Sequence, residues 1–147
     1  YVVAFVMNEE EIDMAYKQPY VMVGSDCGFV EQAGHPRGAG TFPRILGYYV
    51  RERKVMSLMD ALKKMTLLPA QRVHLTHKGE VKEGYDADLV IFDENTIIDR
   101  ATFEEPTLPP EGISYVLLNG EVAVRNNEIV NGRLGTYIPY APAAKRG

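Results

Sequence analysis

The run of residues 21–26, Val-Met-Val-Gly-Ser-Asp, constrains the fold of this 147-residue chain more than any other feature. Residues 20–23 are too apolar for a half-exposed edge strand, so they favour a parallel sheet that is covered on both faces. The run ends abruptly on an acid, and Cys27 and Gly28 follow. Because barrel enzymes keep catalytic groups at the carboxyl ends of such strands, Asp26 is a candidate catalytic residue.

The segments before this run predict a strand followed by a helix. Residues 1–7 are apolar, and Asn8 with Glu11 matches an amino-terminal capping box. The helix should end before Pro19, because the residue before a proline disfavours the helical conformation. Strand, helix and strand in this order form a βα unit of an α/β fold. The chain starts inside an apolar run without a methionine, so we expect it to be part of a longer protein.

Glycines are frequent in residues 27–41 and surround a His-Pro-Arg run at residues 35–37. Glycine permits backbone conformations that other residues avoid, so we expect a bent loop that lies over a site. Three helices should follow this loop. The first is capped by Thr41, the second is capped by Ser57, and Pro69 opens the third.

Beyond Gly79 the hydrophobic pattern changes from helical to strand-like. Residues 88–92 form one predicted strand, and the Asn-Gly pair at residues 119–120 lies between two further β-rich runs. Such a pair is the strongest short signal for a hairpin, because both turn positions need positive φ. A second turn at residues 126–127 extends this to an antiparallel meander. The proline- and alanine-rich tail, residues 139–147, should be frayed.

Composition excludes several classes of protein. The chain is 46% hydrophobic and carries a net charge of −4 with scattered basic residues, which disfavours both a disordered chain and a nucleic-acid partner. No apolar run approaches the roughly 18 residues of a membrane span. The single cysteine, Cys27, can form no disulfide within the chain, so a reducing cytoplasm is the expected location. We expect Cys27 to be a buried, unreactive thiol.

Four motifs follow one another along the chain. They are Gly-Ser-Asp at residues 24–26, His-Pro-Arg-Gly at 35–38, Gly-Thr-Phe-Pro-Arg at 40–44, and Glu-Gly-Tyr-Asp-Ala-Asp-Leu-Val at 83–90. In this order they resemble the carboxyl-terminal part of the N-acyl-D-amino-acid deacylases (D-aminoacylases) of the amidohydrolase superfamily. The last motif alone indicates the superfamily, and the second and third narrow it to the deacylases.

This resemblance implies a zinc-dependent hydrolase, built as a (β/α)₈ barrel with a small β-sandwich that the two ends of the chain form together. Residues 1–78 would then be the last βα units of the barrel, with residues 21–25 as its eighth strand. Residues 79–138 would belong to the β-sandwich, and residues 139–147 would be a flexible tail. The first strands and the metal-binding histidines of the barrel are absent, so we expect the isolated chain to be inactive.

The resemblance also implies roles for Asp26 and Arg37. Asp26 resembles the aspartate that lies at the metal, takes a proton from the attacking water and passes it to the leaving amine. Arg37 resembles the arginine that binds the substrate's α-carboxylate through two parallel hydrogen bonds. We also expect His35, in the same loop, to position the loop or to contact substrate. The alternatives are a turn acid for Asp26, a solvated loop residue for Arg37 and a structural role for His35.

The expected substrate is an N-acyl-D-amino acid, which is hydrolysed to a carboxylate and a D-amino acid. The expected partners are the missing upstream barrel segment and a second copy of the chain, because residues 1–7 and 20–23 would expose strand edges. Neither nucleic acid nor a membrane is expected. Two alternatives stay open: another amidohydrolase reaction, such as cyclic-amide opening or dipeptide hydrolysis, and a non-catalytic assembly or interaction module.

Overall fold

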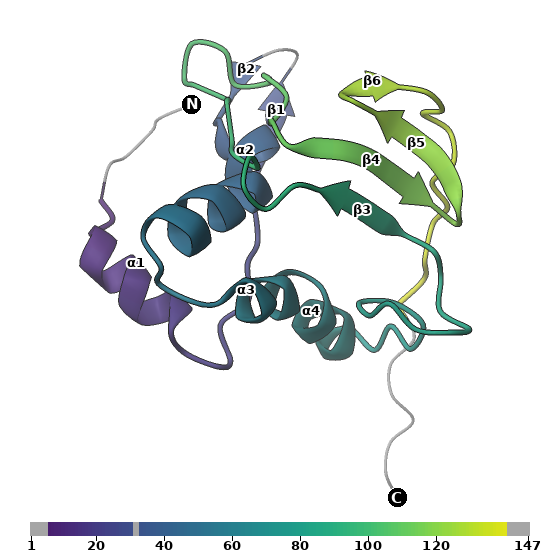
Figure 1. The fold of residues 1–147 in the computed structure, drawn as a ribbon, viewed down its shortest axis with the longest axis horizontal. Helices are drawn as coiled ribbons and strands as arrows, with labels where there is room; N and C mark the ends of the chain where they lie inside the picture. Colours follow the sequence, from purple (N-terminus) through teal and green to yellow (C-terminus); the bar gives the residue numbers. More distant parts are fainter. Residues whose placement is uncertain (1–5, 31–32, 141–147) are drawn as a thin grey trace, which may run out of the picture.

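The computed structural model describes residues 6–30 and 33–140 of the chain. In chain order the elements are α1 (Glu9–Tyr16), β1 (Phe29–Val30), β2 (Ala33–Gly34), α2 (Arg37–Arg44), the π-helix η1 (Ile45–Glu52), α3 (Leu58–Met65), α4 (Leu67–Arg72), β3 (Leu89–Phe92), β4 (Ile113–Leu118), β5 (Glu121–Arg125) and β6 (Glu128–Ile129). Figure 1 shows the helices on one side and the four-stranded sheet β3 to β6 on the other. None of the helices in these ranges has the length and hydropathy of a membrane span.

Helix α1 begins where the capping pattern predicts. The Asn8 side chain accepts a hydrogen bond from the Glu10 backbone N–H at 2.8 Å, and acidic residues fill the first turn, at the positive end of the helix dipole. The helix ends at Tyr16, before Pro19. The predicted helix is therefore confirmed, although the cap bond comes from Glu10 rather than from Glu11.

The strand predicted at residues 20–23 is absent. These residues pair with no strand in the described ranges, and the Tyr20 and Met22 side chains are exposed. A parallel strand needs neighbours that pair with its N–H and C=O groups, and an apolar pattern cannot supply them. Of the other predicted strand, residues 1–5 lie outside the described residues, and residues 6–7 are not in a strand.

Helix α3, rather than a sheet, holds this segment. The buried Lys64 ammonium group donates to the carbonyl oxygens of Gln18 and Val21. The Lys64 carbonyl accepts a hydrogen bond from the Val23 N–H at 3.2 Å. Burying a charged amine is costly unless hydrogen bonds compensate it, and the two carbonyl groups do so here. One buried lysine therefore positions the segment that leads to Asp26.

The glycine-rich segment differs from the predicted loop. Strands β1 and β2 form a short antiparallel hairpin, with Phe29 opposite Gly34. Helix α2 then begins at Arg37, ahead of the predicted cap Thr41. The Thr41 hydroxyl donates to the Arg37 carbonyl at 2.8 Å inside the helix. The apolar spacing predicted a helix only from Thr41 onward. In the structure the glycine-containing residues before Thr41 form the first turn of α2, so Arg37 lies in a helix rather than in a loop.

Pro43 lies inside α2, and the helix widens soon after it. Proline has no N–H to donate within a helix, and its ring crowds the preceding turn. From Ile45 onward the bonding becomes π-helical, as shown by the hydrogen bond from the Arg53 N–H to the Tyr48 carbonyl at 2.8 Å. α2 and η1 are thus consecutive parts of one helical segment.

Helices α3 and α4 correspond to the two other predicted helices. Ser57 caps α3, since its Oγ accepts a hydrogen bond from the Asp60 N–H at 3.1 Å. α4 begins at Leu67, and Pro69 lies within its first turn rather than at its first position. The first turn tolerates a proline, because the N–H groups there have no partner within the helix.

The predicted antiparallel meander is confirmed. Strands β3, β4, β5 and β6 are neighbours in chain order. Asn119 and Gly120 join β4 to β5 with φ of 51° and 81°. Asn126 and Asn127 join β5 to β6 with φ of 46° and 66°. Positive φ at both central positions is the geometry that the two turn signals predict.

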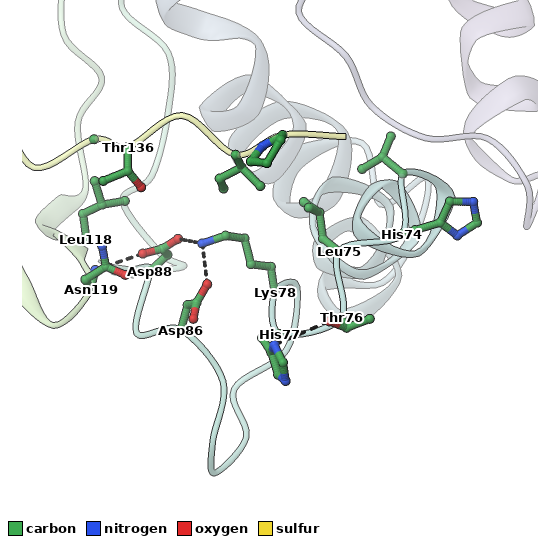
Figure 2. Close-up of a pocket in the computed structure, with 14 residues that line it drawn as sticks. His74, Leu75, Thr76, His77, Lys78, Asp86, Asp88, Leu118, Asn119 and Thr136 are labelled. Carbon is green, nitrogen blue, oxygen red and sulfur yellow. Dashed lines mark hydrogen bonds and ion pairs between the residues drawn. The ribbon is translucent and has the colours of Figure 1, made fainter. Parts of the chain in front are cut away.

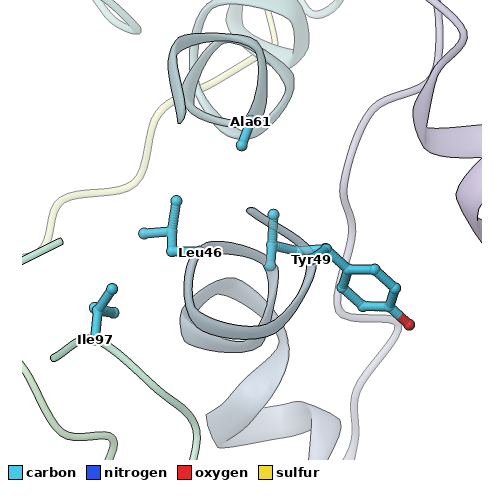
Figure 3. Close-up of a cluster of buried hydrophobic side chains, with 5 residues drawn as sticks. Leu46, Tyr49, Ala61 and Ile97 are labelled. Carbon is cyan, nitrogen blue, oxygen red and sulfur yellow. The ribbon is translucent and has the colours of Figure 1, made fainter. Parts of the chain in front are cut away.

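The core lies between η1, α3 and the connection from β3 to β4 (Figure 3). Ala61 of α3 faces Leu46 of η1, and Ile97 of the connection approaches Leu46 from the opposite side. Gly47 permits this approach, since a Cβ at that position would lie 2.4 Å from the Ile97 carbonyl oxygen. Tyr49 completes the cluster, and its burial raises the pKa of its hydroxyl to about 12. The β3–β4 connection is therefore packed against the helices.

Candidate functional site

Asp26 lies at the surface, between the segment after α1 and the β1–β2 hairpin. Its side chain is 91% exposed, and its backbone φ of 45° falls in the left-handed region that few non-glycine residues adopt. Oδ2 of Asp26 accepts a hydrogen bond from Nη2 of Arg37 at 2.9 Å. A carboxylate has two oxygens and about four acceptor positions, so Asp26 retains capacity for a further donor or ligand.

Arg37, the first residue of α2, points its guanidinium group at Asp26. The Arg37 side chain is 44% exposed, so part of it faces solvent. A guanidinium carries five N–H donors in a planar fork. Arg37 can therefore contact Asp26 and still bind a second carboxylate.

His35 completes the trio that the sequence indicated. Its Nδ1 accepts a hydrogen bond from the Arg37 backbone N–H at 3.1 Å, and its ring packs edge-on against Phe103 at a centroid distance of 5.1 Å. Desolvation, followed by the charge of Arg37, lowers the pKa of His35 below its usual value. The ring is therefore neutral at neutral pH, as the hydrogen bond to Nδ1 requires. The structure brings Asp26, His35 and Arg37 together.

A cavity of about 390 Å³ lies beside this trio, between α2 and the β3–β4 connection. It is lined by His35, Pro36, Arg37, Gly40, Thr41, Arg44, Asp99, Ala101, Thr102, Phe103 and Glu104. Of the two lining arginines, Arg44 lies 3.4 Å from Asp99 and over the Tyr48 ring. Arg37 is the one that contacts Asp26.

Sequence reasoning missed three residues at this cavity: Arg44, Asp99 and Phe103. Helical spacing could not mark Arg44, because the sequence placed Arg37 in a loop before the predicted helix. In the structure both residues belong to α2 and lie about two turns apart, on one face. No local pattern marks Asp99 or Phe103, since both reach the cavity along the β3–β4 connection. A Cβ at Gly40 would lie 3.0 Å from the Asp99 Cβ, so a glycine is what lets the connection approach α2.

The residues that could hold a metal are few. Across residues 6–30 and 33–140, no three histidine, cysteine, aspartate or glutamate side chains are grouped closely enough to bind an ion. Asp26 presents an exposed carboxylate, and carboxylate oxygen is a zinc ligand. Asp26 therefore fits the role of one ligand, and the described residues do not fit a complete metal centre.

Cys27, which we expected to be buried, is exposed. The expectation assumed a sheet covered on both faces, in which alternate residues along the strand are buried. Because the segment before Cys27 forms no strand in the structure, no such sheet covers the thiol. The prediction of a buried cysteine is wrong for this structure.

A second cavity, of about 430 Å³, lies between the end of α4 and the β4–β5 turn (Figure 2). The Lys78 ammonium group lies between Asp86, at 2.9 Å, and Asp88. Asp88 also accepts a hydrogen bond from the Asn119 N–H at 2.9 Å, and hydrogen bonds from Lys78 and Asn119 lower the pKa of Asp88. These charges are paired with one another, so Lys78, Asp86 and Asp88 form a structural joint that connects two loops.

Comparison with known proteins places this geometry in a family. The amidohydrolase family model matches residues 14–124, a range that includes Asp26, His35 and Arg37 and extends into the sheet. The chain belongs to the amidohydrolase family. The match agrees with the resemblance to the amidohydrolase superfamily that the sequence motifs indicated.

The chain is similar to two N-acyl-D-glutamate deacylases and to a D-aminoacylase. The N-acyl-D-glutamate deacylase of Alcaligenes xylosoxydans xylosoxydans is 44% identical over 116 residues, which are 79% of this chain and 24% of that protein. The crystal structure of a D-aminoacylase matches with a TM-score of 0.83 and 39% identity, covering 88% of this chain and 27% of that chain. The N-acyl-D-glutamate deacylase from Bordetella bronchiseptica, solved with zinc and a phosphonate inhibitor, matches with a TM-score of 0.78 and 44% identity over 81% of this chain and 25% of that one.

These similarities confirm the predicted resemblance of this chain to the N-acyl-D-amino-acid deacylases. They also define its extent. The chain spans about a quarter of the length of the curated relatives that it matches.

Proposed function

We propose that this chain forms the catalytic-aspartate and carboxylate-binding part of a zinc-dependent N-acyl-D-amino-acid deacylase. The enzyme hydrolyses an N-acyl-D-amino acid to a carboxylate and a D-amino acid. The observation that carries the proposal is the contact between Asp26 and Arg37, at 2.9 Å, beside a cavity of about 390 Å³. A proton-transfer group and a carboxylate-binding group lie close enough for one small substrate to reach both.

Arg37 supports a substrate with a free α-carboxylate. In an N-acyl amino acid this carboxylate is separated from the scissile amide nitrogen by one carbon, so a group that binds it also positions the amide. The planar fork of Arg37 makes two parallel charge-assisted hydrogen bonds, which set the orientation of a carboxylate as well as its position. An N-acyl-D-amino acid meets this requirement, whereas the opening of a cyclic amide does not need such a group. Dipeptides do carry a free α-carboxylate, and their hydrolysis is an outcome of the test.

Asp26 supports hydrolysis with proton transfer. Zinc, when bound, lowers the pKa of a water molecule toward about 7. Asp26 accepts a proton from the attacking water and donates it to the leaving amine. The exposed carboxylate suits this role, since it can contact the metal and the substrate from the same place. The other zinc ligands come from the missing upstream segment, a proposal supported by the zinc in the related deacylase structure.

The domain arrangement is part of this proposal. Residues 1–78 supply the last βα units of a (β/α)₈ barrel, residues 79–138 supply part of a β-sandwich, and residues 139–147 form the tail. Residues 21–25 become the eighth strand when barrel neighbours pair with them. The similarity to the D-aminoacylase structure supports this arrangement. Of the tail, residues 141–147 lie outside the described residues.

Two further points follow from the same proposal. The isolated chain is inactive, because Asp26 provides only one of the metal ligands and the described residues do not provide the rest. The enzyme works in the cytoplasm on a small molecule, a location supported by the single free cysteine.

The test compares two aspartates in a complete, zinc-loaded enzyme that contains this chain after an upstream amidohydrolase segment. We expect Asp26→Asn to lower kcat for N-acetyl-D-methionine by roughly 10²–10⁴-fold, the range that one positioned acid–base group supplies. Asp86→Asn is the matched control, because Asp86 also has a basic partner at 2.9 Å but lies at the second cavity. Its kcat should stay within about twofold of the parent.

Retention of full activity by Asp26→Asn would reject the catalytic role. Hydrolysis of dipeptides or cyclic amides in place of N-acyl-D-amino acids would identify a different amidohydrolase reaction. A zinc-loaded complete enzyme without activity on any of these substrates would favour the assembly or interaction module.

A further inference from the structure

The first turn of α2 is capped from outside the helix. Pro36 stands at the capping position and makes no side-chain hydrogen bond to the helix. His35, the residue before Pro36, supplies the cap instead: its Nδ1 accepts a hydrogen bond from the Arg37 N–H at 3.1 Å. An N–H in the first turn has no partner within the helix, so this bond satisfies a group that the helix itself cannot. The same N–H belongs to the residue whose guanidinium group contacts Asp26.

The His35 ring is held from the other side of the cavity. Phe103 packs edge-on against it, with the ring planes at 73°. Phe103 belongs to the β3–β4 connection, which the Asp99–Arg44 contact and the close approach of Asp99 to Gly40 hold over α2. A neutral imidazole that accepts at Nδ1 carries its proton at Nε2. The packing and the hydrogen bond together set the orientation and the tautomer of the ring.

We propose that His35 is a positioning residue, which caps α2 through Nδ1 and so holds the Arg37 guanidinium group beside Asp26. Phe103 keeps the His35 ring in the orientation that the cap requires. The kinetic consequence rests on the proposed function, because it needs Arg37 to bind the substrate's carboxylate. The structural consequence, the tautomer of His35, does not.

Two substitutions separate this role from direct contact with substrate. The Oδ1 atom of asparagine is bonded to Cγ, as Nδ1 of histidine is, so His35→Asn keeps an acceptor for the Arg37 N–H. The polar atoms of glutamine lie one bond further out and replace Nε2, so His35→Gln does not. His35→Ala removes both. His77→Ala is the control, because His77 also packs edge-on against an aromatic ring, Tyr85, but lies at the second cavity.

The kinetic experiment uses the complete zinc-loaded enzyme and N-acetyl-D-methionine. We expect His35→Ala and His35→Gln to raise KM by roughly five- to tenfold, the factor that corresponds to one lost helix cap, with kcat changed less than about twofold. His35→Asn and His77→Ala should keep the parent KM. A parent-like KM in His35→Gln with a raised KM in His35→Asn would overturn the proposal in favour of a substrate contact through Nε2. Equal KM values in all three His35 variants would overturn it as well.

A second readout does not depend on activity. In the 147-residue chain labelled with ¹⁵N, imidazole chemical shifts at neutral pH should report His35 as the Nε2-protonated tautomer. The Arg37 amide should shift in His35→Ala and Phe103→Ala and should keep its position in His35→Asn. An Nδ1-protonated His35 would overturn the inference. If the parent enzyme hydrolyses no N-acyl-D-amino acid while these shifts appear, the proposed function fails and the positioning role stands.

Discussion

Arg37 and Arg100 are two partly exposed arginines, and each is paired with one carboxylate. Arg37 lies 2.9 Å from Asp26 and is 44% exposed, whereas Arg100 pairs with Glu111 at 2.6 Å and is 53% exposed. An exposed ion pair contributes little to the stability of the fold. A functional role for either arginine therefore depends on a second binding partner. The proposed function assigns such a second partner to Arg37 alone.

We predict that Arg37→Lys raises KM for N-acetyl-D-methionine by roughly tenfold or more in the complete enzyme. An ammonium group can hold a carboxylate through one point, and it loses the second parallel bond and the orientation that the fork sets. Arg100→Lys is the control, and its KM should not change. Steady-state kinetics on both variants checks this. An unchanged KM in Arg37→Lys would reject carboxylate binding by Arg37.

At the scale of elements, two glycines show how turns and close approaches differ. Gly112 and Gly120 have nearly the same φ, 83° and 81°. A Cβ at Gly112 would lie 2.5 Å from the Ile97 backbone nitrogen, whereas at Gly120 the nearest atom would be 3.9 Å away. Both glycines satisfy a left-handed backbone. Gly112 also lets the β3–β4 connection pass over the start of β4.

We therefore predict that Gly120→Ala lowers the free energy of unfolding by about 1–2 kcal/mol, the cost of a left-handed backbone for alanine. Gly112→Ala should cost at least about 1 kcal/mol more than Gly120→Ala, because backbone atoms must move as well. Urea unfolding of the chain measures both values. Equal losses of unfolding free energy in the two variants would show that the β3–β4 connection can move away from a Cβ at residue 112 without destabilising the fold.

The joint of Lys78, Asp86 and Asp88 gives a pH-dependent prediction for another pair of elements. The pKa of Asp88 is lower in the folded chain than its usual value, because Lys78 and the Asn119 N–H donate to the charged form. The ionised group therefore stabilises the folded state above pH ~4, and this contribution is lost as the pH falls through the lowered pKa.

We expect Asp88→Asn to be less stable than the parent at pH 7 by up to about 1 kcal/mol, a small value because the pair is partly exposed to solvent. The difference should shrink as the pH is lowered from about 5 to 3. Thermal unfolding of both chains across this range is the measurement. A stability difference that stays constant down to pH 3 would contradict the assigned cause.

At the scale of the whole molecule, the described surface carries many large apolar side chains. Those of Val6, Met7, Tyr20 and Ile129 are each more than 70% exposed. The strands of the sheet contain no buried residue on either face. Such a surface is typical of a chain that packs against something else, and unpaired strand edges promote association.

We predict that the isolated chain associates with itself as its concentration rises, and that addition of the upstream barrel segment suppresses this association. The physical reason is that both partners compete for the same apolar surface and strand edges. Sedimentation velocity with and without the upstream segment measures the effect. A monomer mass at all concentrations would show that a second copy of the chain is not a partner.

The first residues of two helices and the hairpin turns of this chain could be predicted from the sequence. Asn8 and Ser57 cap helices and residues 119–120 form the hairpin turn, because caps and turns depend on atoms only a few residues apart. Asp26 could be named as a candidate from its place after an apolar run. Arg37 and His35 could be named because they stand in a motif that carries the family resemblance. The order of those motifs was also enough for the family, which the comparisons confirm.

The tertiary structure alone decided which distant groups meet. Residues 20–23 carry the pattern of a strand but form none, because a strand's hydrogen bonds need partners that the pattern does not contain. Phe103 reaches His35 only because the β3–β4 connection returns over α2, where Gly40 leaves space for it. The sequence by itself therefore determined local conformation and motif chemistry. The packing of the connection on the helix decided the geometry of the candidate site, because that contact joins residues too far apart in the chain for any local pattern to record.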